Sequence, residues 1–93
     1  MTLRFEWDPV KAETNAAKHG VAFAGALTVF ADPLARIFVD PDHSDLERRE
    51  ILIGHSSRRR LLVVFFVERE AGVRILSARP ATRRERRDYE EGS

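Results

Sequence analysis

The residues of this chain best suited to chemistry are arginines in its second half. Four candidates are Arg49, Arg58, Arg79 and Arg83. A guanidinium group presents a planar fork of N–H donors that matches two oxygens of one phosphate. A sheet that delivers several such groups to one edge is therefore typical of a phosphate-binding protein. Each arginine also has a structural interpretation, as a surface ion pair that contributes about 0–1 kcal/mol. The acidic residues available for such pairs are Glu47, Glu50, Glu68 and Glu85.

Three histidines are the candidates for proton transfer, because imidazole is the side chain whose ordinary pKa lies near neutrality. They are His19, His43 and His55. Displacement at a phosphate without a metal ion needs a base for the attacking hydroxyl, an acid for the leaving oxygen and cations for the phosphate charge. Arginines and a histidine would supply these groups. His19 also has a structural interpretation, since a cation at the C-terminus of a helix is favoured by the helix dipole.

Two polar side chains near the C-terminus have both a chemical and a structural interpretation. Glu85 stands three residues after Thr82, which is the spacing of a capping box, and capping is favoured over proton transfer. Tyr89 would stack on a nucleobase or donate a proton. Packing of the final helix against the sheet is the favoured role for its ring.

The sequence argues against metal chemistry. It contains no cysteine, which excludes disulfides, thiolate metal sites and cysteine nucleophiles. No histidine spacing fits zinc. Asp40, Asp42 and Asp45 would suit a hard cation, but together with Pro41 they are more typical of a turn. We therefore expect an activity that needs no metal ion or other cofactor.

Charge is distributed unevenly along the 93 residues, although the net charge is only +1. Residues 1–46 carry four Lys/Arg against seven Asp/Glu, and residues 47–93 carry twelve, all arginine, against eight. This asymmetry favours a phosphate-rich partner, while arginine in place of lysine is also typical of a GC-rich genome. The N-terminus lacks the apolar segment of a signal peptide, and no apolar run reaches the roughly 20 residues of a membrane span. We expect a cytoplasmic protein with no membrane contact.

Sequence patterns predict the elements that position these residues. Asp8 and Pro9 begin a helix that ends near Lys18, before Gly20. A second helix is expected over residues 21–31, although its start offers no capping side chain. Alternating or continuous apolar residues predict four strands, over residues 34–39, 47–55, 61–67 and 73–79. The uncharged run over residues 61–67 is expected to be the central strand, buried on both faces. The alternation at Phe5–Trp7 indicates a short strand or an extended lead-in. A final helix begins at Arg83. This order indicates an α+β fold with two N-terminal helices, a four-stranded, mostly antiparallel sheet and a C-terminal helix, in one domain over residues 1–93.

Six motifs in series resemble the BrnT family of toxins. They are Phe5–Pro9, Lys18–Phe23, Val29–Pro33, Asp40–Ser44, the pair Glu47–Arg49 and Ile53–Ser56, and Ser77–Arg86. None of them is diagnostic alone, but they cover nearly the whole chain in the order typical of the family.

The resemblance implies a compact fold similar to the RelE ribonucleases and the toxin half of a type II toxin–antitoxin pair. Such a toxin cleaves RNA and halts growth, and a BrnA-like antitoxin with a ribbon-helix-helix segment neutralises it. Operator DNA is then bound only through the antitoxin, in a complex of two toxins and two antitoxin chains. His19 lies in the family-like Lys-His-Gly motif and ranks first as the base. The expected catalytic residues are His19, Arg49, Arg79 and Arg83, and the expected RNA-binding residues are Arg58, Arg59 and Tyr89.

A second class of function stays open. The same arginine-rich face would also serve a binding module without catalysis, which holds the backbone of a nucleic acid or an acidic partner. No basic recognition helix is evident, because the final helix mixes four acidic residues among its arginines. Cleavage of RNA in excess chelator separates the two hypotheses.

Overall fold

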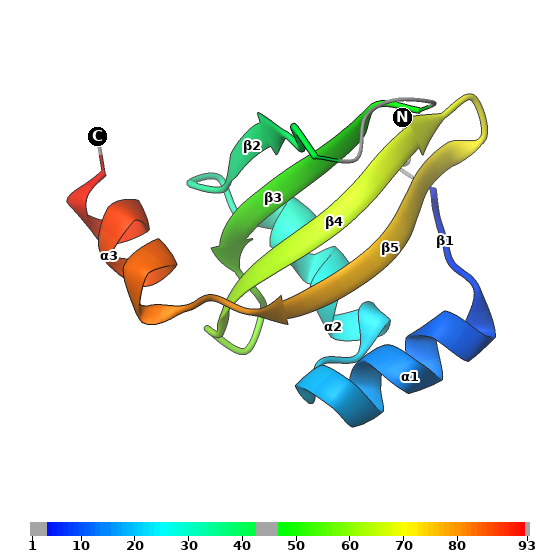
Figure 1. Ribbon diagram of the computed structural model, residues 1–93, viewed down its shortest axis with the longest axis horizontal. Helices are drawn as coiled ribbons and strands as arrows, with labels where there is room; N and C mark the ends of the chain where they lie inside the picture. The colour runs from blue at the N-terminus through cyan, green and yellow to red at the C-terminus, as the bar shows by residue number, and fades with distance from the viewer. Residues whose placement is uncertain (1–3, 43–46, 93) are drawn as a thin grey trace.

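The computed structural model describes residues 4–42 and 47–92 as three α-helices, one 3₁₀ helix and a five-stranded sheet (Figure 1). In chain order the elements are β1 (Phe5–Glu6), α1 (Pro9–His19), α2 (Phe23–Ala26), the 3₁₀ helix η1 (Leu27–Ala31), β2 (Arg36–Val39), β3 (Arg49–His55), β4 (Leu61–Arg69), β5 (Gly72–Pro80) and α3 (Arg83–Glu91). None of the helices in these two ranges is long and apolar enough to cross a membrane.

The expected four-stranded sheet is corrected to a mixed sheet of five strands, in the order β1-β5-β4-β3-β2. The additional strand, β1, has two residues and pairs in parallel with β5, while the other pairings are antiparallel. Its neighbour Arg4 accepts a hydrogen bond from the N–H of Val73 (2.8 Å). Gly72 allows this approach, because a Cβ there would lie 2.4 Å from the Arg4 carbonyl oxygen. The alternation at Phe5–Trp7 indicated a short strand or an extended lead-in, and the strand is confirmed, but its pairing with β5 was not predicted.

The first and last helices follow their capping signals. The Asp8 carboxylate accepts from the N–H of Val10 (2.9 Å), and Gly20 ends α1 with a left-handed φ of 67°. Thr82 and Glu85 form the expected capping box, with Thr82 N–H to Glu85 at 2.8 Å and Glu85 N–H to Thr82 at 3.1 Å. The predicted starts at Pro9 and Arg83 are confirmed.

The prediction of a single helix over residues 21–31 is wrong. This segment contains the four-residue α2, followed by the five-residue η1. The buried residues Phe23, Ala26 and Val29 recur every three positions, which matches the three residues per turn of a 3₁₀ helix. No side chain caps the start of α2, and the hydroxyl of Thr28 donates to the carbonyl of Gly25 (2.6 Å), so propensity does not favour the α form.

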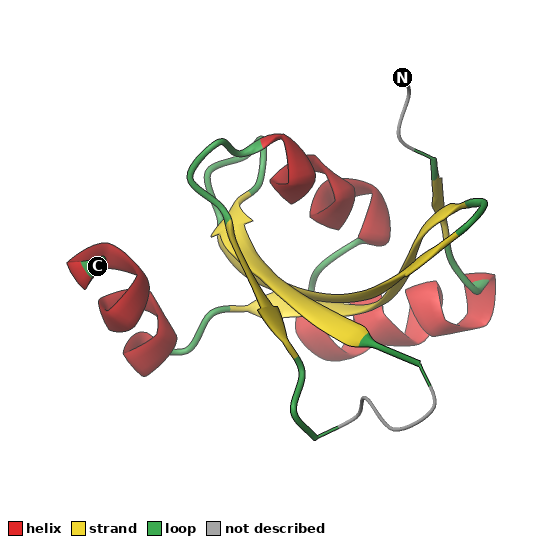
Figure 2. Cartoon of the chain, turned by 90° about the horizontal axis from the view of Figure 1, so that it is seen from above, coloured by secondary structure: helices red, strands yellow, loops and turns green. Residues whose placement is uncertain are grey.

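The sheet has a large core on one face and a small one on the other. The α1, α2 and η1 side buries Phe23, Val29, Leu62, Phe66 and other apolar side chains. The opposite face has a smaller cluster around Ile53, Leu61 and Val63, with Tyr89 of α3 packed against it. Figure 2 shows α3 apart from the other helices, beyond the end of β5. The predicted central strand is confirmed as buried on both faces.

Asn15 of α1 is a buried polar group that ties this helix to the sheet. Its amide N–H group donates to the carbonyls of Val21 (3.0 Å) and Ala78 (2.8 Å), and its carbonyl oxygen accepts from the N–H of Ala78 (3.0 Å). Asn15 is only 6% exposed, so water cannot take its place as the hydrogen-bond partner of these backbone groups. One residue therefore fixes α1, the α1–α2 link and β5 relative to each other.

We expect Asn15→Ala to lower the free energy of unfolding by about 2–4 kcal/mol, because it leaves buried backbone groups without partners. Urea denaturation measures this loss. Glu13→Ala, at an exposed position of the same helix, is the matched control and should change stability by less than about 0.5 kcal/mol. Equal effects of the two substitutions would contradict the structural role of Asn15.

Candidate nucleic-acid interface

Three chain segments meet at the edge of the sheet where β3 ends, β4 begins and β5 ends. His55 pairs with Leu61, and the N–H of Ala81 donates to the carbonyl of Leu61 (3.0 Å). The basic edge, as we call it, comprises His55, the turn Ser56–Arg60 and the segment Ala81–Arg87. Its arginines are Arg58, Arg59, Arg60, Arg83, Arg84, Arg86 and Arg87. The contact at Leu61 thus brings two arginine-rich segments, more than 20 residues apart in sequence, to one place.

The turn between β3 and β4 has a defined conformation. The N–H of Ser56 donates to the Arg60 carbonyl (2.9 Å), and the N–H of Arg59 donates to the Ser56 carbonyl (2.8 Å). Arg59 has a φ of 64°, a left-handed conformation that is uncommon for a residue with a side chain. The guanidinium of Arg60 donates to the Gly20 carbonyl (3.0 Å), whereas Arg58 and Arg59 are exposed. The turn therefore presents two arginines to solvent and uses the third to hold α1.

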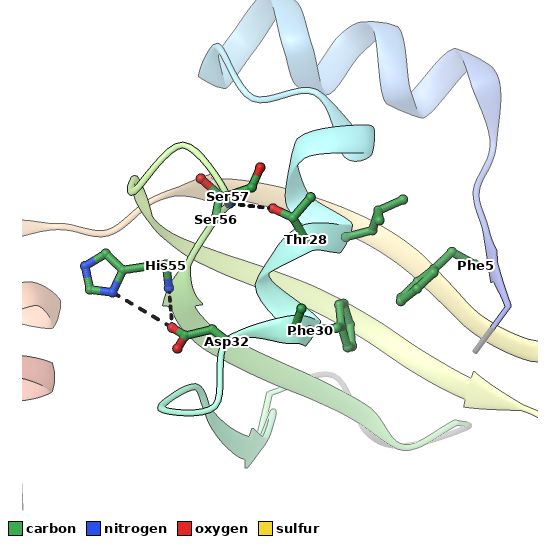
Figure 3. A pocket seen from close by; sticks show the side chains of 9 residues that line it. Phe5, Thr28, Phe30, Asp32, His55, Ser56 and Ser57 are labelled. Carbon is green, nitrogen blue, oxygen red and sulfur yellow. Dashed lines mark hydrogen bonds and ion pairs between the residues drawn. The ribbon is translucent and has the colours of Figure 1, made fainter. Parts of the chain in front are cut away.

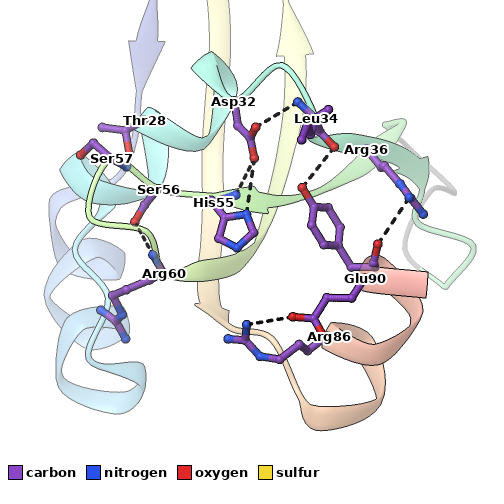
Figure 4. Close-up of polar contacts among 11 residues, drawn as sticks. Thr28, Asp32, Leu34, Arg36, His55, Ser56, Ser57, Arg60, Arg86 and Glu90 are labelled. Carbon is purple, nitrogen blue, oxygen red and sulfur yellow. Dashed lines mark hydrogen bonds and ion pairs between the residues drawn. The ribbon is translucent and has the colours of Figure 1, made fainter. Parts of the chain in front are cut away.

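His55 lies between this turn and α3 (Figure 4). Its Nδ1 is 3.9 Å from Oδ2 of Asp32, and its side chain is 42% exposed while that of Asp32 is 12% exposed. The Tyr89 ring meets the imidazole edge-on, with centroids 5.6 Å apart. A half-exposed imidazole with a carboxylate near one of its nitrogens suits proton transfer.

The Asp32 carboxylate is held by the backbone. The N–H of His55 donates to its Oδ2 (2.7 Å) and the N–H of Leu34 donates to its Oδ1 (2.9 Å). These backbone donors, His55 first, lower the pKa of Asp32 below its ordinary value of 3.8. Asp32 is therefore ionised at neutral pH and places a fixed negative charge beside His55.

Tyr89 is positioned from several sides. Its hydroxyl donates to the Leu34 carbonyl (3.2 Å), and the guanidinium of Arg36 lies over its ring, 5.3 Å from the centroid. Burial first, and then the nearby charge of Asp32, raise the pKa of the Tyr89 phenol above 10.0. The phenol is therefore protonated at neutral pH. The expected packing of the final helix against the sheet through Tyr89 is confirmed.

Arg79 is not directed to solvent. Its guanidinium makes a two-pronged contact with Glu85, at 2.7 and 2.9 Å, and lies 5.8 Å from the centre of the Phe65 ring. Hydrogen bonding to Arg79 is the main reason that the pKa of Glu85 is lowered from 4.5 to about 2. The same contact raises the pKa of Arg79. The same carboxylate caps α3, so this pair fastens the first turn of α3 to β5.

Arg49 shares a surface depression with Arg79 but not with the basic edge. The two arginines line a hollow of about 450 Å³ with Ile51, Phe65 and Ser77 among its walls. Arg49 stands at the first residue of β3 and the turn follows its last residue, so about 20 Å of strand separates them. The structure therefore does not bring Arg49, Arg58, Arg79 and Arg83 to one phosphate, as a single four-arginine site requires.

His19 ends α1 on the other side of the sheet edge from His55. The carbonyl of the next residue, Gly20, accepts from Arg60, so His19 lies near the turn. The helix that His19 ends packs on the large-core face of the sheet, opposite the face that α3 borders. His43 and Asp45 lie outside the described residues. Among the residues that the structure describes, no three histidine or acidic side chains are grouped so as to hold a metal ion.

Sequence reasoning missed Asp32, which it placed in the Val29–Pro33 motif without a role in the site. It also missed Arg36 and Arg60 as residues that hold neighbouring elements. Asp32 and His55 are 23 positions apart, and no local pattern connects them. The only available signal was an acidic residue at the end of a helix that faces the end of a predicted strand.

A pocket of about 720 Å³ adjoins His55 and Asp32 along η1 (Figure 3). Rings of Phe5 and Phe30 form one part of its wall, and Thr28, Ser56 and Ser57 form the part next to His55. The Thr28 hydroxyl accepts from the N–H of Ser57 (2.9 Å), which fixes the turn against η1. Apolar rings beside hydroxyl groups suit a nucleobase next to a phosphate at the basic edge.

Comparisons with known proteins identify the family and the fold of this chain. Residues 7–85 match the family described as the ribonuclease toxin, BrnT, of type II toxin–antitoxin systems. The fold is similar to the 1.1 Å crystal structure of the Brucella abortus ribonuclease toxin BrnT, with a TM-score of 0.68 and 28% sequence identity. The match covers 88% of this chain and 100% of that one. Among curated protein sequences, none matches this chain.

The Arg79–Glu85 pair predicts how stability depends on pH. The carboxylate of Glu85 has a folded pKa of about 2 against an ordinary value of 4.5. Its contribution is therefore fully present above about pH 4.5 and is lost as the pH falls through about 2. We expect Glu85→Gln to lower the free energy of unfolding by about 1 kcal/mol at pH 7, and this difference from wild type should shrink between pH 4.5 and 2.

Urea denaturation across this pH range measures the difference. Glu90→Gln is the matched control, since Glu90 forms only a 3.8 Å surface pair with Arg86 and is 62% exposed. Its difference from wild type should be small and nearly independent of pH. A Glu85→Gln difference that stays constant down to pH 2 would show that the pair does not stabilise the fold.

Proposed function

The chain belongs to the BrnT family of ribonuclease toxins of type II toxin–antitoxin systems, and from this premise we propose that it is a metal-independent endoribonuclease with its catalytic site at the basic edge. The observation that carries the proposal is the half-exposed His55 imidazole, 3.9 Å from the ionised Asp32 and flanked by two arginine-rich segments. Membership of the family supports the reaction, and the contacts of His55 support the proposed location of the catalytic site.

The reaction that suits these groups is an internal displacement on phosphorus. His55 takes the proton of the RNA 2′-hydroxyl, and the nearby charge of Asp32 stabilises the imidazolium that forms. The 2′-oxygen then forms a bond to the phosphorus while the bond to the 5′-oxygen breaks. The leaving 5′-oxygen takes a proton from water at this open edge, so the step gives a cyclic phosphate and a 5′-hydroxyl.

Arginines would hold the charge that develops on the phosphate oxygens. Arg83, Arg58 and Arg59 are exposed on the two segments that border His55, and fixed cations stabilise such charge better than water does. Arg79 serves this site indirectly, because its contact with Glu85 holds α3 in place. Arg49, at the far end of β3, would contact a different phosphate of the RNA. Tyr89 positions the imidazole.

The wider biology follows from the family and belongs to the same proposal. Residues 1–93 would act as one toxin domain in the cytoplasm, cleave cellular RNA and arrest growth. A BrnA-like antitoxin would neutralise the toxin in a complex of two chains of each, and operator DNA would be bound through the antitoxin.

The competing function is a binding module that holds RNA or another polyanion without cleaving it. The observation that favours it is the pairing of Arg79, an expected catalytic residue, with Glu85 rather than with solvent. Such a module would bind the polyanion through Arg58 and Arg59 and would not need the Asp32–His55 pair. Substitution of His55 therefore separates the two functions.

We expect His55→Gln to reduce RNA cleavage by purified protein about 10²–10⁴-fold, because the substitution removes the group that moves the proton. The assay uses excess EDTA and an RNA substrate, with a 2′-deoxy substrate that must remain intact. His19→Gln is the matched control and should cleave at nearly the wild-type rate. Loss of activity in His19→Gln with activity retained in His55→Gln would move the base to α1.

The turn arginines give a separate prediction for binding. Single-stranded RNA releases about 0.7 counterions per phosphate contact, so Arg58→Ala/Arg59→Ala should weaken RNA binding and reduce the slope of log affinity against log salt by about 1.4. Arg48→Ala, an exposed arginine near the start of β3, should leave that slope unchanged. Fluorescence anisotropy between 50 and 200 mM salt measures both. An unchanged slope in the double variant would remove the turn from the RNA interface.

A further inference from the structure

The edge strand β2 has the greatest concentration of exposed apolar side chains among the described residues. Ile37, Phe38 and Val39 are 56%, 51% and 45% exposed, and Leu34 just before them is 74% exposed. β2 pairs with β3 on one side only, and on its outer side it has no strand partner in the described part of the chain. An apolar edge with unpaired backbone N–H and C=O groups is a surface for strand addition.

An apolar groove adjoins this edge on the sheet face that α3 borders. It has a volume of about 320 Å³. Its floor and one wall come from β2, β3 and β4, namely Phe38, Val39, Ile51, Ile53 and Val63, and Tyr89 of α3 stands on the other side. Residues from four elements therefore form one continuous apolar surface with the outer edge of β2.

We propose that this surface docks an extended apolar segment of the antitoxin, which pairs with β2 as a sixth strand and places apolar side chains in the groove. The inference rests on the proposed function only in that the partner is the antitoxin of a type II pair. Pairing with β2 supplies backbone hydrogen bonds, and the groove selects the side chains of the segment.

A second copy of this chain fits the surface less well. Antiparallel pairing of two β2 strands would extend the sheet sideways and leave the groove on its face uncovered. β2 has only four residues, so such a pair buries far less than the roughly 800 Å² per partner of a stable interface. A segment that pairs with β2 and then turns over the sheet face covers both parts of the surface.

The rim of the groove indicates the charge of the segment. Arg36 is already engaged with the carbonyl groups of Gly92 (2.8 Å) and Tyr89 (3.4 Å). Glu85 is engaged with Arg79. Asp88 also lines the groove, and its carboxylate has no side-chain partner among the described residues. An apolar strand with a Lys or Arg that reaches Asp88 is the complementary ligand.

This surface is distinct from the basic edge but touches it through one residue. Tyr89 lines the groove and also meets the His55 imidazole edge-on. A segment seated in the groove therefore lies directly behind the proposed catalytic histidine. The antitoxin would block the toxin from this position without using the arginines that RNA would contact.

The test compares Phe38→Asp with Val10→Asp. Both place a carboxylate at an exposed apolar position, but Val10 (68% exposed) is on α1, away from the surface. The probe is the protein encoded by the reading frame adjacent to the toxin gene, titrated by calorimetry. We expect Phe38→Asp to weaken binding at least 10-fold and Val10→Asp to leave it unchanged. Hydrogen exchange of residues 34–41 should slow in the wild-type complex.

Three outcomes overturn the proposal. The first is equal affinity of wild type and Phe38→Asp for the probe. The second is slowed hydrogen exchange in the complex that is confined to elements other than residues 34–41. The third is a wild-type homodimer that Phe38→Asp converts to monomers while probe binding stays unchanged. The last result would assign the surface to a second copy of this chain. RNA cleavage is assayed separately on both variants. Absence of cleavage by wild type would reject the ribonuclease, while a Phe38-dependent complex would still support the docking surface.

Discussion

The carboxylate of Asp32 is the interaction on which the arrangement of the basic edge depends. It follows the last turn of η1, accepts from the N–H of Leu34 before β2, and accepts from the N–H of His55 at the end of β3. Gly54 makes this approach possible, because a Cβ there would lie 2.9 Å from Oδ2 of Asp32 and 2.8 Å from Cβ of Ala35. One charged group therefore fixes three elements, and the same group sets the environment of the imidazole.

The C-terminal helix is attached to the sheet in a different way from the other helices. It has no buried residue, and its contacts are mostly polar. They are the Arg79–Glu85 pair, the hydroxyl of Tyr89 on Leu34 and the guanidinium of Arg36 on Tyr89 and Gly92. Elements with few buried apolar contacts open at low free energy. The helix that carries four of the seven arginines of the basic edge is thus the least firmly held one, which suits a surface that must accommodate a flexible RNA strand.

Local patterns predicted most elements but not how they meet. Capping residues at Asp8, Gly20 and Thr82 placed the ends of α1 and the start of α3, because caps act within one turn. The parallel pairing of β1 with β5 was not predicted, because the partner residues lie nearly 70 positions away. A register shift between β4 and β5 at Phe65/Phe66 sends Ile75 into the large core, whereas Arg79 remains on the opposite face. Strict alternation of side chains along β5 would place both residues on one face.

The arginines show why residue type alone does not locate a phosphate site. A guanidinium fork matches a carboxylate as well as it matches a phosphate, so any arginine with a fixed carboxylate within reach is already bound. Glu85 is such a carboxylate, because the capping box holds it in place before Arg79 meets it. Arg58 and Arg59 lie on a turn held by backbone and hydroxyl groups, and within residues 4–42 and 47–92 no carboxylate forms an ion pair with either of them. The distinction between an arginine that holds the fold and one that is available to a ligand therefore depends on where the acidic side chains are fixed, and a helix cap is one of the few such places that a sequence reveals.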